Sequence, residues 1–321
     1  MSSPPLQLRL IGIRYKAEGV LEFELQDPSG AALPPHTCGA HIDLHLAGGL
    51  VRSYSLCNAT ADTHRYIVAV GLDAKSRGGS KYLHETVRVG SPIAVTAPRN
   101  TFPLVEDARH SLLIAGGIGV TPLWSMAQRL TELGRSWEIF YAARSRRTAA
   151  YVQELEALAL RSGGKVHLHF DDVEGRAADL APVFARVDPR THAYCCGPAP
   201  MIEAFRAAAQ ARLPDEQVHI EFFKAADPVQ RTGDAFSVCL NRSGRVLPVG
   251  SEQSILDVLL DAGVDIPYSC MEGICGSCQL NVVEGIPDHR DSVLSNRQRA
   301  ANDVVIACCS RSKSELLVLD V

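Results

Sequence analysis

The chain has 321 residues, of which 46% are hydrophobic and 21% are charged, and its formal net charge is −4. This length favours two or three domains over a single core, and the composition is typical of a globular protein. The sequence has neither an apolar run of the ~18–20 residues that a membrane span needs nor a basic–aromatic stretch typical of nucleic-acid binding. We therefore expect no membrane and no nucleic acid as partners.

The first segment, from Leu6 to Pro103, consists of short apolar or alternating runs separated by Gly, Pro, Asp and Asn. Such runs predict a small antiparallel β-barrel with one short helix near Lys81–Thr86. The predicted strands are Leu8–Ile13, Leu21–Leu25, Ala40–Leu46, Arg65–Val70 and Pro92–Thr96.

From Ser111 onward, buried-type runs alternate with amphipathic segments, which predicts a parallel sheet with helices on both faces. The predicted strands are Leu112–Ala115, Trp137–Ala142, Val166–Phe170, Tyr194–Cys196 and Val218–Phe223. The predicted helices are Thr121–Leu133, Ala149–Arg161 and Ala199–Ala211.

A polar stretch rich in helix and strand breakers, Asp227–Gly233, predicts a linker. A small β-sheet with one helix is predicted after it. That helix spans about Ser254–Ala262, opened by Ser254 or Gln253 and stopped at Gly263. The predicted strands are Phe236–Leu240, Val246–Val249, Gln279–Glu284, Val304–Cys308 and Leu316–Leu319. The predicted domains are thus 1–103, 104–226 and 234–321, with the linker at 227–233.

Four cysteines in this last segment have the spacing Cys270-x4-Cys275-x2-Cys278, followed after a long gap by Cys308. This is the plant-type spacing of a [2Fe–2S] cluster. Structural zinc prefers two short cysteine pairs, which this pattern lacks. Because Cys309 directly follows, it is a second candidate for the fourth ligand; we prefer Cys308 on spacing and expect Cys309 to point the other way.

The loop also contains Gly273 and Gly276, which can adopt the positive φ angles of a backbone wrapped around a cluster. The chain has ten cysteines, and Met1–Pro5 lacks the basic and apolar regions of an export signal. We therefore expect a cytoplasmic protein, because in a reducing compartment clustered cysteines indicate metal binding or catalysis.

In the first segment, Arg52-Ser53-Tyr54-Ser55 lies at the end of a strand, and Arg77-Gly78-Gly79-Ser80 opens the short helix. An arginine beside glycines at a helix N-terminus offers a guanidinium fork and free N–H groups to a phosphate. Tyr54 offers a flat face to a heterocycle, and Ser55 offers a hydroxyl to a ring nitrogen. By itself R-x-Y-S is a weak signal, because an edge-strand arginine beside a packed tyrosine is common.

In the second segment, Gly116-Gly117-Ile118-Gly119-Val120-Thr121-Pro122 joins a strand to a helix. Glycines at such a junction let a pyrophosphate approach the backbone, although the pattern is not G-x-G-x-x-G. Cys196-Gly197-Pro198 follows a later strand at the same edge of the sheet. The alternative for Cys196 is a buried small hydrophobic residue.

These motifs, in this order, resemble those of the ferredoxin–NADP⁺ reductase superfamily. With the cysteine motif at the C-terminal end, nearly the whole chain resembles the phthalate dioxygenase reductase family. The resemblance implies a multidomain α+β fold: an antiparallel β-barrel that binds FMN rather than FAD, a parallel-sheet α/β domain that binds NAD(P)H, and a β-grasp ferredoxin domain.

The resemblance also implies site residues. The FMN site would be Arg52, Ser53, Tyr54, Ser55, Ala69, Val70, Gly71, Gly78, Gly79, Ser80 and Phe223. The nicotinamide cofactor site would be Gly117, Gly119, Thr121, Asp171, Cys196, Gly197 and Pro198. The cluster ligands would be Cys270, Cys275, Cys278 and Cys308. Ser55 near flavin N5, Cys196 near the reacting carbon and Phe223 against the flavin ring are the candidate catalytic residues.

One departure from the family pattern concerns the choice of cofactor. Arg144-Ser145-Arg146-Arg147 follows the second strand of the sheet, and its guanidinium groups can accept a 2′-phosphate. Asp171 and Asp172, after the next strand, argue for an unphosphorylated ribose. We prefer NADH and leave NADPH open.

The implied activity is hydride transfer from NADH to FMN, followed by single-electron transfer through the cluster to the Rieske-type oxygenase component of a two-component system. A reductase that serves a cytochrome P450 or another iron protein is the alternative within enzymes. A non-catalytic redox sensor is disfavoured because no output domain remains unassigned. We expect a monomer when the chain is on its own.

Overall fold

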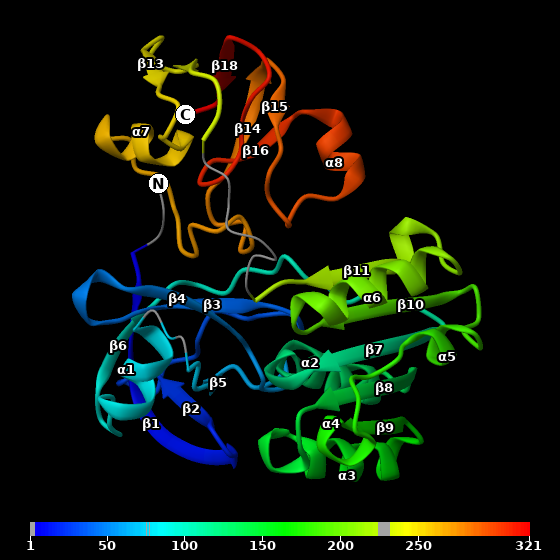
Figure 1. The fold of residues 1–321 in the computed structure, drawn as a ribbon. Helices are drawn as coiled ribbons and strands as arrows, with labels where there is room; N and C mark the ends of the chain where they lie inside the picture. Colours follow the sequence, from blue (N-terminus) through cyan, green and yellow to red (C-terminus); the bar gives the residue numbers. More distant parts are fainter. Residues whose placement is uncertain (1–3, 75, 77, 224–231) are drawn as a thin grey trace. The chain divides into compact units, whose positions relative to one another are not determined.

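The computed structural model describes residues 4–74, 76, 78–223 and 232–321. Contacts divide the chain into two compact units, one covering 4–223 and the other beginning after Phe223. Figure 1 labels the helices and strands of both units along the chain. Of the predicted linker, 227–231 lies outside the described residues, as do 224–226 of the predicted second domain, and the predicted domain boundaries stay predictions.

The first hundred residues form a six-stranded antiparallel sheet in the order β4-β3-β6-β1-β2-β5. Leu56, just after β4, pairs with Val68 of β5, so the two edges meet and the sheet closes into a barrel. The elements are β1 (Leu6–Ala17), β2 (Val20–Gln26), β3 (His41–His45), η1 (Ala47–Gly49), β4 (Val51–Ser55), β5 (Tyr66–Gly71), α1 (Gly79–Glu85) and β6 (Pro92–Val95).

The barrel interior holds alternate side chains of these strands, among them Leu8, Leu10, Phe23 and Leu25. This alternation is the signal from which strands were predicted. The hairpin of β1 and β2 extends further in both directions than the predicted runs, because two register shifts in β1 let it bend around the barrel.

The next segment forms a fully parallel five-stranded sheet in the order β11-β10-β7-β8-β9. Its strands are β7 (His110–Gly116), β8 (Ser136–Ala143), β9 (Lys165–Phe170), β10 (Thr191–Cys196) and β11 (Val218–Glu221). The chain runs outward from β7 through β8 to β9 and then returns to β10 on the other side of β7. The strand order therefore reverses between β7 and β10, where open α/β sheets bind ligands.

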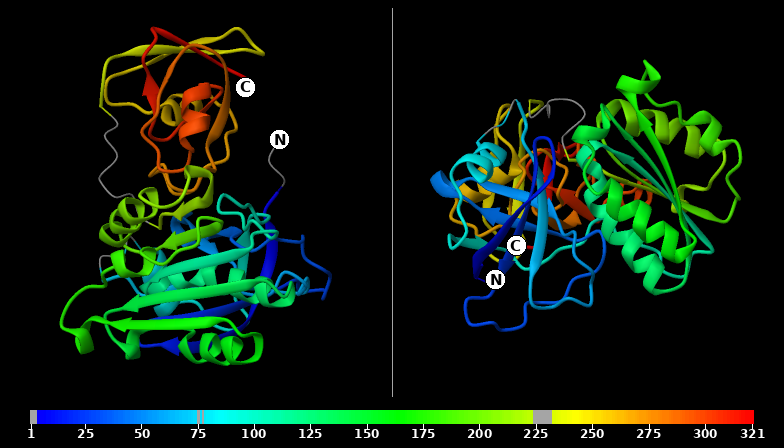
Figure 2. Two further views of the ribbon diagram at one scale, coloured as in Figure 1. Left: turned by 90° about the vertical axis from the view of Figure 1, so that its right-hand side faces the viewer. Right: turned by 90° about the horizontal axis from the view of Figure 1, so that it is seen from below.

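Helices cover both faces of this sheet (Figure 2). The helical elements are η2 (Gly117–Gly119), α2 (Val120–Glu132), η3 (Arg146–Thr148), α3 (Val152–Ser162), α4 (Asp171–Glu174), α5 (Ala181–Phe184), α6 (Ala199–Gln210) and η4 (Asp215–Gln217). The three long helices were predicted within a few residues. The short ones, α4 and α5, are single turns whose sequences carry little helical periodicity.

The second unit is a mixed sheet in the order β13-β12-β18-β14-β16, in which β12 and β18 run parallel. The elements are β12 (Phe236–Leu240), β13 (Val246–Val249), α7 (Ile255–Asp261), β14 (Gln279–Glu284), β15 (Pro287–Asp288), α8 (Asn296–Ala301), β16 (Val304–Ile306), β17 (Arg311–Ser312) and β18 (Leu316–Leu319). The predicted fold class is confirmed for all three parts of the chain.

Capping explains both helices of this unit. Ser254 and Asp257 form a reciprocal capping box at α7. Ser254, one of the two residues predicted to open this helix, is thus its N-cap. Ser295 and Gln298 form the same box at α8, a helix that was not predicted although this S-x-x-Q signal is present.

The end of the predicted linker is attached to the second unit. The carbonyl of Thr232 accepts a hydrogen bond from Arg290, and the N–H of Gly233 donates to Ser251. The buried guanidinium of Arg311 donates to the carbonyls of Gly233 and Asp234 as well. Thr232 and Gly233, at the end of the predicted linker, are thus hydrogen-bonded to the second unit.

Candidate active site and cluster-binding loop

The glycine turn after β7 packs tightly against the loop after β10. A Cβ atom at Gly119 would lie 2.1 Å from the carbonyl oxygen of Cys196, and one at Gly116 would lie 2.6 Å from Cδ of Pro198. Gly117 differs: its φ is +54° and nothing lies within 4 Å of its added Cβ. Two glycines thus serve close packing, while Gly117 leaves backbone open to a ligand.

Three polar side chains from distant parts of the sequence meet beside this turn. Ser55 ends β4 of the barrel, Cys196 ends β10, and Glu221 ends β11 opposite Cys196. All three are buried. Burial raises the pKa of Glu221 to about 8, although hydrogen bonding from Cys196 and Ser55 acts in the opposite direction. Burial and the neighbouring Glu221 likewise raise the pKa of Cys196.

Glu221 was not among the predicted site residues. Its Oε2 atom is buried and has no hydrogen-bond partner among the described residues. The available signal was a carboxylate within the apolar run Ile220–Phe223, where an unpaired charge is costly. A buried carboxyl group that holds its proton near neutral pH is typical of functional sites.

The predicted flavin residues of β4 have different environments. The hydroxyl of Ser53 donates to Asp43, 2.6 Å away, and Asp43 is also paired with Arg99. Tyr54 packs against the barrel core, and burial raises its pKa to about 12. Arg52 lies along the N-terminus of α1, where a Cβ at Gly79 would come within 2.6 Å of its Cγ.

The other predicted flavin residues lie on β5 and at the start of α1. Val70 points into the barrel core, so it can face a ligand only through its backbone, and its carbonyl already contacts His84. Ala69 belongs to the core shared with the α/β sheet, and Gly71 lies against Ile118. Gly78 has a φ of +96°. Arg77 lies outside the described residues.

The hydroxyl of Ser80 accepts a hydrogen bond from the N–H of Asp73 and contacts Ser76. It therefore ties the loop before α1 together. Thr121, in the first turn of α2, donates to the carbonyl of Ile118 and holds the glycine turn in shape. Phe223 packs against the core that the barrel shares with the sheet.

The arginines that would accept the 2′-phosphate of NADPH lie beside the aspartates that argue for NADH. The N–H of Asp172 donates to the carbonyl of Arg144, which joins the start of α4 to the turn after β8. Arg146 pairs with Glu156, and Arg147 pairs with Glu18 of the barrel. These exposed pairs are worth little energetically, but they give both guanidinium groups carboxylate neighbours.

Asp171 lies at the same edge, at the start of α4, with its Oδ1 atom 3.3 Å from Nε2 of His169. Asp171 follows the C-terminal end of β9, and the glycine turn follows the C-terminal end of β7. Both therefore lie at the same edge of the parallel sheet, two strands apart.

In the second unit the side chains of three of the four predicted cysteines come together. The side chain of Cys270 lies within hydrogen-bonding range of both Cys275 and Cys308. Cys278 is buried, and its carbonyl accepts a hydrogen bond from the N–H of Ala307, next to Cys308. The N–H of Glu272 donates to Sγ of Cys270 at 3.3 Å. Such N–H···S bonds stabilise thiolates around iron.

The loop backbone has the predicted conformation, since Gly273 and Gly276 have φ angles of +69° and +70°. Met271 also has a positive φ. Among the described residues no three His, Cys, Asp or Glu side chains are arranged for a single metal ion. A [2Fe–2S] cluster instead needs two thiolates for each of its two irons, and these cysteines fit that need.

Cys309 does not turn away from the loop as expected. A Cβ atom at Gly273 would lie 2.6 Å from Sγ of Cys309, so this thiol packs beneath the loop. It also contacts the carbonyl of Ile306 at 3.7 Å and the hydroxyl of Ser310 at 3.8 Å. The Cys308 side chain lies within hydrogen-bonding range of both Cys270 and Cys309. The two neighbouring thiols therefore have different surroundings, which supports Cys308 as the ligand.

Two family models match the chain. One, described as a 2Fe-2S iron-sulfur cluster binding domain, matches residues 238–313, and the other, an oxidoreductase NAD-binding domain, matches residues 113–207. In the part of the chain that the structure describes, no helix is both long and apolar enough to cross a membrane.

Curated relatives match over nearly the full length. Phenoxybenzoate dioxygenase subunit beta of Ectopseudomonas oleovorans is 48% identical over 317 residues, covering 99% of this chain and 98% of the relative. Tetrachlorobenzoquinone reductase of Sphingobium chlorophenolicum is 47% identical over 318 residues, covering 98% of each. Among solved structures, phthalate dioxygenase reductase matches with a TM-score of 0.71 and 38% identity, covering 99% of this chain and 98% of that chain.

Proposed function

Because the chain belongs to the phthalate dioxygenase reductase family, we propose that it passes electrons from NADH through FMN and a [2Fe–2S] cluster to a Rieske-type oxygenase component. The observation that carries this proposal is the meeting of Ser55, from the barrel, with Cys196 and Glu221, from the α/β sheet. A flavin on the barrel and a nicotinamide at the glycine turn would face each other there. When bound, the flavin turns a two-electron hydride into single-electron steps, which the cluster accepts.

The residues around this point fit both cofactors. Gly117 leaves open backbone for a dinucleotide where the strand order reverses, and α2 points its N-terminus toward it. Arg52 lies beside the start of α1, where it can bind the flavin phosphate. Phe223 is proposed to cover the flavin ring.

The roles of Ser55, Cys196 and Glu221 follow from their chemistry. The hydroxyl of Ser55 can donate to a flavin nitrogen, and the buried thiol of Cys196 bounds the space beside the glycine turn. At pH 7 the Glu221 carboxyl holds a proton, since its pKa is raised to about 8. We assign to Oε2 of Glu221 the exchange of the proton that accompanies hydride transfer.

A second candidate function is the reduction of a quinone. It is favoured by the 47% identity with tetrachlorobenzoquinone reductase, a name that specifies the acceptor of that relative. The same three modules also suit a cytochrome P450 as acceptor. We retain the oxygenase component as the first choice.

We also propose that the protein is monomeric and cytoplasmic. All ten cysteines are free, and such cysteine usage is typical of a reducing compartment.

Purified protein tests the proposal directly. Extraction should release FMN, and anaerobic NADH should bleach first the flavin and then the cluster. Turnover should be fast with cytochrome c and with a Rieske oxygenase component, whose reduction is followed by EPR. Faster turnover with a tetrachlorinated quinone or with a P450 would favour those alternatives, and negligible NADH oxidation with every acceptor would overturn the proposal in favour of a redox sensor.

A further inference from the structure

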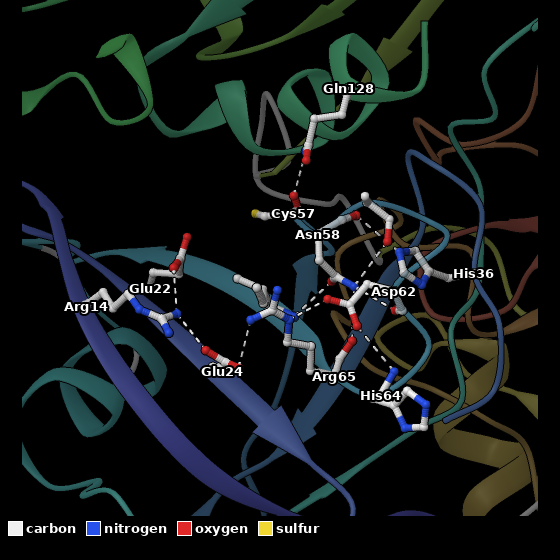
Figure 3. Close-up of polar contacts among 12 residues, drawn as sticks. Arg14, Glu22, Glu24, His36, Cys57, Asn58, Asp62, His64, Arg65 and Gln128 are labelled. Atoms are coloured by element: carbon white, nitrogen blue, oxygen red, sulfur yellow. Dashed lines mark hydrogen bonds and ion pairs between the residues drawn. The ribbon is translucent and has the colours of Figure 1, made fainter. Parts of the chain in front are cut away.

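Helix α2 begins directly after the glycine turn, so its position sets the position of that turn. One of its side chains reaches the barrel, and another stacks on the residue that precedes α3. Gln128 donates from Nε2 to the carbonyl of Cys57 at 2.9 Å, as Figure 3 shows. Trp124 stacks on Tyr151, with ring centroids 5.6 Å apart and planes at 19°. The register between α2 and the barrel therefore depends on Cys57 and Tyr151.

Tyr151 is held in an unfavourable backbone conformation. Its φ is +61°, in the left-handed region that non-glycine residues rarely adopt, and it immediately precedes α3. The residue is only 2% exposed. Such strain costs on the order of 1 kcal/mol or more and persists only where the surroundings enforce it. The surroundings that enforce it come from the barrel.

The hydroxyl of Tyr151 donates to Oε2 of Glu22 in β2 at 2.8 Å, across 129 residues of sequence. Lys16 of β1 lies over the tyrosine ring, with Nζ 4.8 Å from its centroid. The same Nζ atom is 3.2 Å from Glu22 and 3.0 Å from Glu154 of α3. We call Lys16, Glu22, Tyr151 and Glu154 the interdomain latch.

Lys16, Glu22 and Tyr151 are shielded from solvent, whereas the side chain of Glu154 is 38% exposed. The side chain of Lys16 is 17% exposed and that of Glu22 is 7% exposed. Burial lowers the pKa of Lys16, but Glu154 and Glu22 outweigh it and leave the pKa raised. Arg14 adds a further contact to Glu22, visible in Figure 3. Removal of the Tyr151 hydroxyl would leave Lys16 as the partner of Oε2 of Glu22.

The latch also lies next to the predicted flavin strand. Glu22 is the register partner of Ala69 in β5, two residues before Gly71. Gly71 in turn lies against Ile118 of the glycine turn. The barrel and the sheet are thus in contact both at the ligand edge and at the latch.

We propose that Tyr151 is a positioning residue: its hydroxyl, held by Glu22, fixes α2 and the glycine turn against the flavin barrel at the separation that hydride transfer needs. The inference rests on the proposed function, because it assumes a flavin on the barrel and a nicotinamide at the turn. A misplacement of about 1 Å can cost up to ~100-fold in rate.

The test is Tyr151→Phe, which removes the hydroxyl and keeps the ring stacked on Trp124. We expect the limiting rate of flavin reduction, measured by rapid mixing with saturating NADH, to fall about tenfold. The primary isotope effect with deuterated NADH should rise, while FMN content and the cluster spectrum stay unchanged. Tyr15→Phe is the matched control, because Tyr15 is 72% exposed on β1.

A Tyr151→Phe protein with a lower melting temperature but an unaltered limiting rate and isotope effect would overturn the inference and leave Tyr151 a structural role only. If this variant is recovered without FMN, Glu22→Leu is measured in its place, because it removes the acceptor of the Tyr151 hydrogen bond, and a normal limiting rate there overturns the inference equally. Failure of NADH to reduce the flavin of the unaltered protein would instead refute the proposed function, and the inference with it.

Discussion

The cluster loop and the site around Glu221 are assembled in opposite ways. Three of the four cluster thiols lie within Cys270–Cys278, and local backbone conformation brings them together. Ser55, Cys196 and Glu221 come from a barrel strand and two strands of a different sheet. A locally encoded site depends on its own residues, whereas an assembled site depends on packing between domains that lies far from the chemistry.

The largest effect should come from removing a ligand from the locally encoded cluster site. Cys308→Ser should lower NADH-driven reduction of cytochrome c by about two orders of magnitude, because the cluster loses a ligand. Reduction of ferricyanide by the flavin alone should continue. Cys309→Ser is the matched control and should keep the cluster's visible and EPR spectra, since this thiol packs under Gly273 rather than facing Cys270. The reverse pattern would make Cys309 the ligand.

The second effect comes from disturbing the packing beside Ser55, Cys196 and Glu221, the site assembled from separate strands. Gly119→Ala places a methyl group 2.1 Å from the Cys196 carbonyl oxygen. Overpacking of this kind costs typically ~1–3 kcal/mol, so we expect a lower melting temperature and a raised KM for NADH.

Gly117→Ala separates packing from ligand approach, because nothing lies within 4 Å of its added Cβ. It should lose NADH affinity with a smaller loss of stability, limited to the strain of its positive φ. Equal losses of stability in the two variants would contradict the distinct roles of these glycines.

A further effect, which depends on pH, concerns the proton on Glu221. Because its folded-state pKa is raised to about 8, the folded protein keeps a proton that the unfolded chain releases above about pH 4.3. The unfolding free energy should therefore fall as pH rises from about 5 to 8, by at most ~1.4 kcal/mol per pH unit.

Glu221→Gln removes this titration, so chemical denaturation at several pH values should give a flatter profile for the variant. The variant should also slow flavin reduction, since its amide cannot exchange the proton. Parallel pH profiles for the two proteins would show that Glu221 does not titrate in this range.

Most of the chemistry was predictable because it is encoded in short spacings. The cysteine pattern, the glycine turn and the capping residue Ser254 each act within a few residues of sequence, so one chain suffices to identify them. The α8 helix was missed despite its capping box, since it is only six residues long. The orientation of Cys309 was also mispredicted, because alternation along a strand does not hold in the turn that follows β16.

The sequence by itself determined the kinds of cofactor, the order of the modules and the cluster ligands that we propose, because thiolate and glycine patterns have few other physical uses. Only the tertiary structure brought Glu221 to Cys196 and Ser55, and only it joined Tyr151 to Glu22. These contacts span up to 166 residues between Ser55 and Glu221. They form when strand order and domain packing bury polar groups that must then find partners, which no local pattern specifies.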